Sequence, residues 1–366
     1  MKTFRRPILV VLVVAAAALV STGGSIAASM HWVIQKTPNP PGADTSYLQG
    51  VSCPTAKSCI AVGYSRSGSK YSTLAEKWNG AKWVVLKTPN PSSLGEFTGV
   101  ACSSASACTA VGYYINSGGT RSTLAARWNG TKWALQRTPN AAGGSSSTLV
   151  GVACPTRGFC VAVGYSDYGG TLAERWNGQR WSILPSPNPA GVLTAVLSGV
   201  SCTSVTACTA VGFSSNGTLA ERWNGVGWEI QPTVNPEGSG DKLSAVSCAS
   251  PTACMAVGFS AGSGWARPVV ERWDGAKWSK LSAPGVTTFS LLSAVSCTSP
   301  RACTAVAYSS KGTLAERWNG TKWTVQPTPN PPGVGNSLHA VSCPTASVCT
   351  AVGNDGEDTL AERWTG

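Results

Sequence analysis

The cysteines form the most regular chemical pattern in this chain of 366 residues. All 14 fall into seven pairs with the spacing Cys-x5-Cys, and the first members of neighbouring pairs are 46 to 52 residues apart. A structural zinc ion takes four ligands, whereas each of these turns offers two cysteines and no histidine. The spacing therefore favours local disulfides, which form in an oxidising compartment. The predicted bonds are Cys53–Cys59, Cys102–Cys108, Cys154–Cys160, Cys202–Cys208, Cys248–Cys254, Cys297–Cys303 and Cys343–Cys349.

Glutamate recurs in a second repeated segment, Thr-Leu-Ala-Glu-Arg-Trp. In a β-strand this order places Leu, Glu and Trp on one face. The carboxyl groups then lie beside apolar neighbours, and we expect Arg or backbone amides as their partners. The second copy has Ala126 at this position, so the pattern indicates a structural role and not catalysis. The repeated residues are Glu174, Glu221, Glu271, Glu316 and Glu362.

Other groups that could carry out catalysis are scarce. The two histidines, His31 and His339, lie in no recognisable nucleophile or metal motif. The acidic segment Gly-Asn-Asp-Gly-Glu-Asp-Thr offers Asp355, Glu357 and Asp358 as calcium ligands. The segment fits no complete calcium-binding loop, so we expect an acidic turn there. No cofactor is predicted.

Each repeat unit contains four predicted strands. Strand A ends in Val-Ser-Cys (Leu48–Cys53), and strand B begins at the second cysteine (Cys59–Tyr64). Strand C is the glutamate segment (Thr218–Trp223), and strand D begins at a second Trp (Trp228–Pro232). Asn-Gly or Asp-Gly between C and D favours a hairpin, and the prolines of Thr-Pro-Asn-Pro end the ladder after D. The two Trp of each unit are expected to fill the wedge between neighbouring sheets. Repeats of this kind are typical of a β-propeller.

The two ends of the chain indicate how the repeat closes. The seventh unit stops at Gly366 without a strand D, and His31–Pro40 is a strand D without the other three. Placed after Gly366, Trp32 restores the spacing of the Trp pair. We therefore predict that residues 28–366 form an all-β, seven-bladed propeller with four-stranded antiparallel blades. Its N-terminal strand completes the last blade beside Leu360–Trp364 and leaves no unpaired end blade. We expect a monomer.

Residues 1–27 have the pattern of a secretory signal peptide. Three basic residues precede an apolar run at Ile8–Val20, and small residues lead to a cleavage site after Ala27. The run is short for spanning a bilayer, so we expect cleavage, no membrane span in the mature chain, and a secreted or cell-surface protein. An uncleaved anchor is the alternative. The formal net charge of +12 is scattered along the chain, and without a nucleic-acid motif no nucleic-acid partner is expected.

Strands within a blade alternate in direction, so the loops fall on two rims. The A–B and C–D turns share one rim and are nearly uniform, whereas the B–C and D–A loops share the other rim and vary. Variable loops on a rigid scaffold often carry binding residues. Aromatic and basic side chains in these loops suit stacking on a sugar or contact with a protein. The candidates are Arg66, Lys70, Tyr71, Tyr114, Arg121, Tyr168, Trp265 and Arg267.

The Trp-Asn-Gly-x-x-Trp, Thr-Pro-Asn-Pro and Ala-Val-Gly-Tyr motifs resemble repeats of uncharacterised secreted β-propeller-like proteins of Gram-positive bacteria. The resemblance extends from Met30 to the end of the chain. More distantly, the chain resembles kelch propellers, although it lacks their double Gly after strand B. The resemblance implies the fold and the location, and it carries over no functional residue.

The sequence therefore favours a secreted binding or interaction module that holds an envelope glycan or a protein ligand on its variable rim. The alternative is an extracellular polysaccharide hydrolase or lyase with its site in the central channel. Such an enzyme would need two carboxylates about 5–10 Å apart, and the sequence does not identify such a pair. A purely structural surface protein is the third hypothesis.

Overall fold

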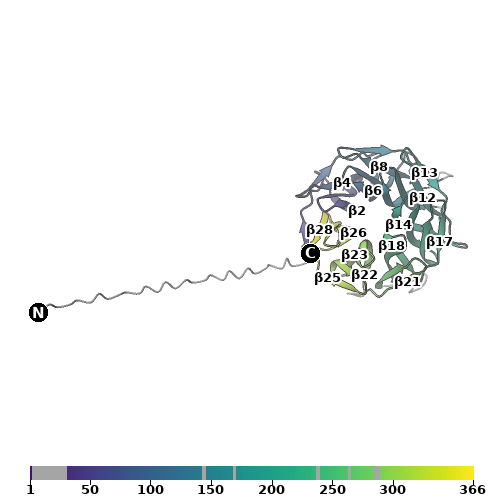
Figure 1. Cartoon of the computed structure of the whole chain (residues 1–366). Helices are drawn as coiled ribbons and strands as arrows, with labels where there is room; N and C mark the ends of the chain where they lie inside the picture. The colour runs from purple at the N-terminus through teal and green to yellow at the C-terminus, as the bar shows by residue number, and fades with distance from the viewer. Residues whose placement is uncertain (2–30, 142–145, 168–169, 236–239, 263–264, 284–288) are drawn as a thin grey trace.

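The computed structural model describes Met1 and residues 31–141, 146–167, 170–235, 240–262, 265–283 and 289–366. All regular structure within these ranges is β, and 28 strands form seven four-stranded antiparallel sheets around a ring (Figure 1). The predicted seven-bladed propeller is thus confirmed. In the described part of the chain no helix is long and apolar enough to cross a membrane. Apart from Met1, the predicted signal peptide lies outside the described residues and stays a prediction.

The strands follow the predicted order, with strand A innermost and strand D outermost in each blade. Blade 1 comprises β2 (Thr45–Thr55), β3 (Ser58–Ser67), β4 (Lys70–Trp78) and β5 (Trp83–Leu86). Blade 2 comprises β6 (Gly95–Ser104), β7 (Ala107–Ile115), β8 (Arg121–Trp128) and β9 (Trp133–Gln136). Blade 3 comprises β10 (Ser147–Thr156), β11 (Phe159–Ser166), β12 (Gly170–Trp176) and β13 (Trp181–Leu184). Blade 4 comprises β14 (Ala195–Ser204), β15 (Ala207–Ser214), β16 (Gly217–Trp223) and β17 (Trp228–Gln231). Blade 5 comprises β18 (Asp241–Ser250), β19 (Ala253–Gly262), β20 (Trp265–Trp273) and β21 (Trp278–Lys280). Blade 6 comprises β22 (Ser290–Ser299), β23 (Ala302–Ser309), β24 (Gly312–Trp318) and β25 (Trp323–Gln326). Blade 7 comprises β26 (Asn336–Thr345), β27 (Val348–Asp355), β28 (Thr359–Thr365) and β1 (His31–Gln35).

Blade 7 is completed by the N-terminal strand, as the sequence predicts. Strand β1 pairs with β28 in a register that sets Trp32 opposite Trp364, and the two ring centroids are 6.1 Å apart. Beyond the strand, the Thr37 hydroxyl donates to the Thr359 carbonyl at 2.7 Å, and the Asn39 side chain accepts from the Thr359 amide at 3.1 Å. The first and last strands of the chain therefore share one sheet and close the ring.

The hydrophobic core lies between blades. One buried cluster joins Val161 and Val163 of blade 3 to Trp223 and Trp228 of blade 4, and the other interfaces repeat this arrangement. The predicted wedge-filling role of the Trp pairs is therefore confirmed. The strand C arginine adds a polar contact to the next blade: Arg222 stacks on the Trp273 ring at 4.8 Å. Strand β17 ends at Gln231, one residue before the proline that the predicted strand D included.

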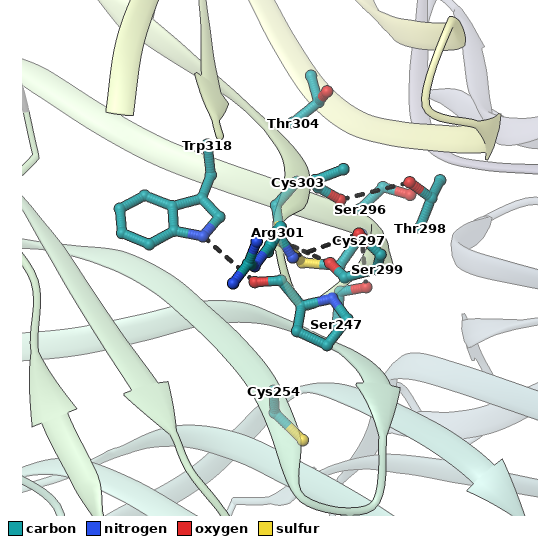
Figure 2. Close-up of a disulfide and its surroundings, with 12 residues drawn as sticks. Ser247, Cys254, Ser296, Cys297, Thr298, Ser299, Arg301, Cys303, Thr304 and Trp318 are labelled. Carbon is teal, nitrogen blue, oxygen red and sulfur yellow. Dashed lines mark hydrogen bonds between the residues drawn. A yellow bond between two sulfur atoms is a disulfide. The ribbon is translucent and has the colours of Figure 1, made fainter. Parts of the chain in front are cut away.

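All seven predicted disulfides form, each between strands A and B of one blade. Figure 2 shows the bond between Cys297 and Cys303. Beside it, the Ser247 hydroxyl of blade 5 accepts a hydrogen bond from the Cys297 amide at 2.9 Å. The Trp318 indole donates to the Pro300 carbonyl at 3.3 Å. This disulfide thus fixes a turn whose backbone also contacts the neighbouring blade.

Replacing both cysteines of one pair tests this contribution. We expect the Cys297→Ala/Cys303→Ala variant to lose about 2 kcal/mol of unfolding free energy, because a short covalent loop is released in the unfolded chain. Urea unfolding followed by tryptophan fluorescence measures the loss, with the exposed Thr298→Ala substitution in the same turn as the control. Equal stability of the two variants would contradict the prediction.

Candidate binding site on the variable rim

The loops divide between two rims as predicted. On the uniform rim, the C–D turn of each described hairpin lies against the A–B turn, and in blade 4 the Cα of Gly225 faces Thr206. Gly225 has φ of 98°, which explains why Gly follows Asn in these turns. On the other rim, the D–A segment contacts the start of strand C: the Asn90 side chain accepts from the Thr73 amide at 2.7 Å.

This Asn–Thr contact recurs around the ring and was not predicted. The Asn seven positions after the strand D Trp accepts from the amide of the strand C Thr in blades 1, 2, 3, 4, 6 and 7. Blade 5 has Pro268 in place of the Thr and Gly285 in place of the Asn. This paired replacement is the sequence signal that could have revealed the contact. The contact is structural, and it holds the variable rim in place.

A cluster of tyrosines lies on this rim over blade 1. Tyr64 directly follows the Ala-Val-Gly of strand B and is half-buried. Its ring meets Tyr47 of strand A edge-on, with centroids 5.3 Å apart, and lies 5.7 Å from Tyr71 of strand C. Burial, together with Glu96 of blade 2, raises the Tyr64 pKa above its ordinary value. The hydroxyl is therefore a neutral hydrogen-bonding group at physiological pH.

The cluster continues onto blade 2 with charged groups. The Arg121 guanidinium lies over the Tyr113 ring at 5.1 Å. Burial and the nearby Glu96 carboxyl raise the pKa of Tyr113 to about 12. Burial also raises the Glu96 pKa, while Tyr113 and Arg121 act in the opposite direction. We call this cluster the tyrosine patch: Tyr47, Tyr64, Tyr71, Glu96, Tyr113 and Arg121.

Other predicted rim residues lie at the margins of the patch. Arg66 is exposed and pairs with Tyr71 across the β3–β4 hairpin, and its Nε donates to the Gly68 carbonyl at 2.9 Å. Lys70 is exposed at the start of β4. Tyr114 is half-buried and lines a cavity of about 720 Å³ at the outer side of blade 2. Tyr168 lies outside the described residues.

Trp265 and Arg267 belong to a different part of the rim. They lie in β20 of blade 5, which is separated from blades 1 and 2 by two blades in either direction around the ring. The Arg267 guanidinium covers the half-buried Trp265 ring at 5.3 Å. The predicted rim residues therefore form two groups, and the group on blades 1 and 2 is the larger.

Tyr64 and Tyr113 were not among the predicted binding residues, because an aromatic residue ends the predicted strand B in six units. An aromatic residue that recurs in the repeat is expected to have a structural role. However, the strand A residue that is paired with this aromatic residue differs between blades. Tyr47 and Glu96 occupy this position in blades 1 and 2, and Lys242 occupies it in blade 5. This cross-strand variation was the available signal.

The strand C glutamates have no exposed surface: Glu76, Glu174, Glu221, Glu271, Glu316 and Glu362. Arg partners were expected, and this was wrong. The observed partners come from the preceding blade or its loop: the Ser186 hydroxyl donates to Glu221 at 2.7 Å, and Thr218 donates to Glu271 at 3.2 Å. The other expected partner, a backbone amide, is observed at one site: the Val234 amide donates to the Glu271 carboxyl at 3.3 Å.

Burial raises the pKa of these carboxyl groups. The pKa is about 8 for Glu76, Glu174, Glu316 and Glu362. It is about 7 for Glu221, where the Ser186 hydroxyl partly offsets the effect of burial. Carboxyl groups held in this way are protonated over much of the neutral range, which suits a structural role.

The remaining candidates show no assembled catalytic or metal site. Asp355 and Asp358 close a turn in which the Asp355 amide donates to the Asp358 carbonyl at 3.0 Å. Across the described ranges, no three His, Cys, Asp or Glu side chains are placed to share a metal ion. His339 hydrogen-bonds through Nδ1 to the Leu48 carbonyl of blade 1 at 3.1 Å, and burial lowers its pKa. His339 therefore links the inner strands of blades 7 and 1.

Comparisons with known proteins identify the fold but no family. No family model matches the chain, and no curated protein sequence matches it significantly. A structure described as YCF48 bound to D1 peptide shares 12% identity with a TM-score of 0.59, covering 92% of this chain and 95% of that one. YCF48 from Cyanidioschyzon merolae shares 13% identity with a TM-score of 0.59, and the alignment covers 92% and 98% of the two chains. U3-55K shares 10% identity with a TM-score of 0.60, again over 92% and 98%. The predicted resemblance to secreted repeat proteins and to kelch propellers stays a prediction, and the similarity to these structures establishes a β-propeller.

Proposed function

We propose that the chain is a secreted protein-binding propeller that holds a segment of a partner protein on the tyrosine patch. The observation that carries this proposal is the patch itself: four tyrosines, one arginine and one glutamate on the variable rim of two neighbouring blades. Tyr and Arg are enriched among residues that dominate binding energy at protein interfaces. Tyrosine also contributes contact area at a low cost in side-chain entropy.

The arrangement of the patch supports a mixed apolar and polar ligand segment. Half-buried rings such as Tyr64 and Tyr71 offer apolar faces, and their neutral hydroxyl groups both donate and accept hydrogen bonds. Arg121 and Arg66 supply exposed positive charge beside these rings. One structure of similar fold is described as bound to a peptide, which supports peptide or protein recognition as a use of this scaffold.

The extracellular location is part of the same proposal. Residues 1–27 match a secretory signal peptide, and the seven disulfides suit an oxidising environment. An envelope glycan remains the competing ligand, since tyrosine and arginine also contact sugars. No observation on the described residues favours the polysaccharide hydrolase or lyase.

Selection of ligands from a phage-displayed library of random peptides tests the proposal. We expect peptides enriched on the wild-type protein to bind about tenfold more weakly to Tyr71→Ala and Arg121→Ala variants, because hot-spot truncation costs at least about 1–2 kcal/mol. Trp265→Ala is the matched control on the distant group of rim residues. Isothermal titration calorimetry measures the affinity, and thermal unfolding verifies that each variant is folded.

Two results would contradict the proposal. Peptide binding that is equal for the wild-type, Tyr71→Ala and Arg121→Ala proteins would place the site elsewhere. Binding of neutral oligosaccharides on a glycan array, lost in the same two variants while no peptide is selected, would assign the patch to glycan recognition.

A further inference from the structure

The outer wall of the ring carries two adjoining cavities between blades 2 and 3. Their volumes are about 720 and 470 Å³, and Gln136 lines both. Their lining comes mainly from strands C and D of blade 2, from residues 137–140 directly after β9, and from the two turns of blade 3 on the uniform rim. We call this surface the side groove and define it by six lining residues: Arg127, Leu135, Gln136, Arg137, Arg157 and Arg180.

The side groove has an excess of positive charge. Arg137, Arg157 and Arg180 are exposed, and none of the described residues that line the two cavities is acidic. Residues 97–188 contain seven Lys or Arg and two acidic residues. Asp167 lies in a loop of the variable rim, and Glu174 has no exposed surface. The groove therefore attracts anionic groups without a local carboxylate to compete for them.

One of these arginines is held in a fixed position. The Arg127 guanidinium stacks on the Trp176 ring of blade 3 at 4.9 Å, and it donates to the Arg157 carbonyl at 2.8 Å. Burial lowers the Arg127 pKa, and the charge of Arg157 acts in the same direction. An anion placed between Arg127 and Arg157 would lower their mutual repulsion, because one carboxylate accepts hydrogen bonds from several N–H donors.

The backbone of the groove offers a second recognition element. Strand β9 is the outermost strand of blade 2, so one of its edges has no partner strand within the sheet. Leu135 on this strand is 46% exposed. The neighbouring Gln136 points to the opposite face, where its side chain accepts from the Trp181 indole at 2.8 Å. A strand added here meets Leu135 on one face and, on the face of Gln136, the turn of blade 3 that carries Arg180, while Arg137 directly follows the end of β9.

Blade 2 differs from blades 3, 4 and 6 in the residue that follows strand D. Strand D is followed directly by Pro185, Pro232 and Pro327 in blades 3, 4 and 6, whereas Arg137 follows it in blade 2. Proline lacks the amide donor that an added strand requires. In blade 4 the outer strand also carries Glu229, which would repel an acidic ligand.

We propose that the side groove binds an extended acidic peptide, which adds a strand to the open edge of β9 and places carboxylates against Arg137 and Arg180. Strand addition of this type draws its affinity from main-chain hydrogen bonds and its specificity from alternate side chains. An alternating peptide suits the site, with an apolar residue over Leu135, acidic residues on the face of Arg180, and a further carboxylate at the end of β9 within reach of Arg137. The six residues that define the side groove are distinct from those of the tyrosine patch, and the proposal does not depend on the function of that patch.

A fluorescent peptide of alternating Glu and Val tests this proposal on the full-length protein. We expect fluorescence anisotropy to show binding that weakens as salt is added, and no binding of the alternating Lys and Val peptide. The Arg137→Glu/Arg180→Glu variant should bind the acidic peptide at least about tenfold more weakly. Lys322→Glu, at the position in blade 6 that corresponds to Arg180, should leave the affinity within about twofold, because it changes net charge alone.

A further comparison tests the class of ligand. Oligogalacturonate presents carboxylates but cannot pair with a strand edge. If it displaces the acidic peptide at the same concentration and with the same dependence on Arg137 and Arg180, the groove recognises polyanions and the proposed peptide is the wrong occupant. The proposal is equally overturned if the peptide does not bind, or if its affinity is unchanged by the double arginine variant.

Discussion

Deleting residues 1–40 will lower the melting temperature of the protein by about 10 °C or more. The deletion removes β1, and with it the burial of Trp32 against Trp364 and the five-residue ladder to β28. Truncation of a buried Trp alone costs about 3–5 kcal/mol. One kcal/mol corresponds to about 2–4 °C in a domain of moderate size. Differential scanning calorimetry measures the change.

The damage should be greatest in blade 7. Its contact with blade 1 includes a hydrogen bond from Arg363 to the Ala56 carbonyl at 2.6 Å and one from the Cys53 amide to the Ser342 hydroxyl at 3.0 Å. These contacts do not involve β1 and survive the deletion. Strand β28 would then become an unpaired edge, which promotes pairing between molecules. We expect the truncated protein to associate with increasing concentration in analytical ultracentrifugation.

A permuted chain provides the decisive control. The variant begins at Pro41 and carries residues 30–40 after Gly366, so Trp32 lies five positions after Trp364, as in the other Trp pairs. If β1 acts only by completing the sheet, this chain regains a melting temperature within a few degrees of the wild type. A permuted chain as unstable as the deletion would show that the N-terminal connection itself is needed.

Ring closure and the disulfides could be predicted because both depend on spacing along the chain. The C–D hairpin fixes the interval between its two Trp, so a missing Trp after Gly366 implied a partner elsewhere, and Trp32 was available. The cysteines of each pair are separated by six positions and joined by a short turn. In both cases the spacing within one unit of the repeat shows which partner is needed.

Contacts between units were harder to predict. The hydroxyl partner of Glu271 is Thr218, which belongs to the preceding blade, and the order of residues within one unit gives no information about this pairing. The tyrosine patch was missed in part for the same reason, because Tyr64 and Glu96 come from different blades. Trp265 was grouped with Tyr71 by loop type, although ring position separates them. A repeat sequence predicts the scaffold well, and it predicts poorly which variable residues are neighbours.

The buried glutamates make the stability of the protein decrease with pH. Burial raises the pKa of Glu316 from 4.5 to about 8. Between these values the folded protein holds a proton that the unfolded chain releases, so stability is fully present below about pH 4.5 and is lost as the pH rises through about 8. Each such group lowers the unfolding free energy by up to about 1.4 kcal/mol per pH unit in this window. Several groups acting together give a large effect.

Glu316 is the best site for a single substitution. Among the described residues its carboxyl oxygens have no hydrogen-bond partner, and burial alone shifts its pKa, whereas a Thr hydroxyl partly offsets burial at Glu76 and Glu174. We expect Glu316→Gln to have nearly the stability of the wild type at pH 4 and to be more stable by about 2 kcal/mol or more at pH 8. The amide is neutral at every pH, so the proton release on unfolding is removed. Urea unfolding at a series of pH values measures the difference.

Two further variants determine whether burial causes the effect. Glu229→Gln removes an exposed carboxyl group in blade 4, and its stability should follow the wild type at every pH. Glu221→Gln should also gain stability with pH, but the gain should level off about one pH unit earlier, because the Ser186 hydroxyl keeps the Glu221 pKa near 7. If Glu316→Gln and Glu229→Gln gave the same pH profile, the Glu316 carboxyl would be ionised in the folded protein, and burial would not hold its proton. Water would then have to reach the Glu316 carboxyl on the buried face of strand C, although Glu316 has no exposed surface.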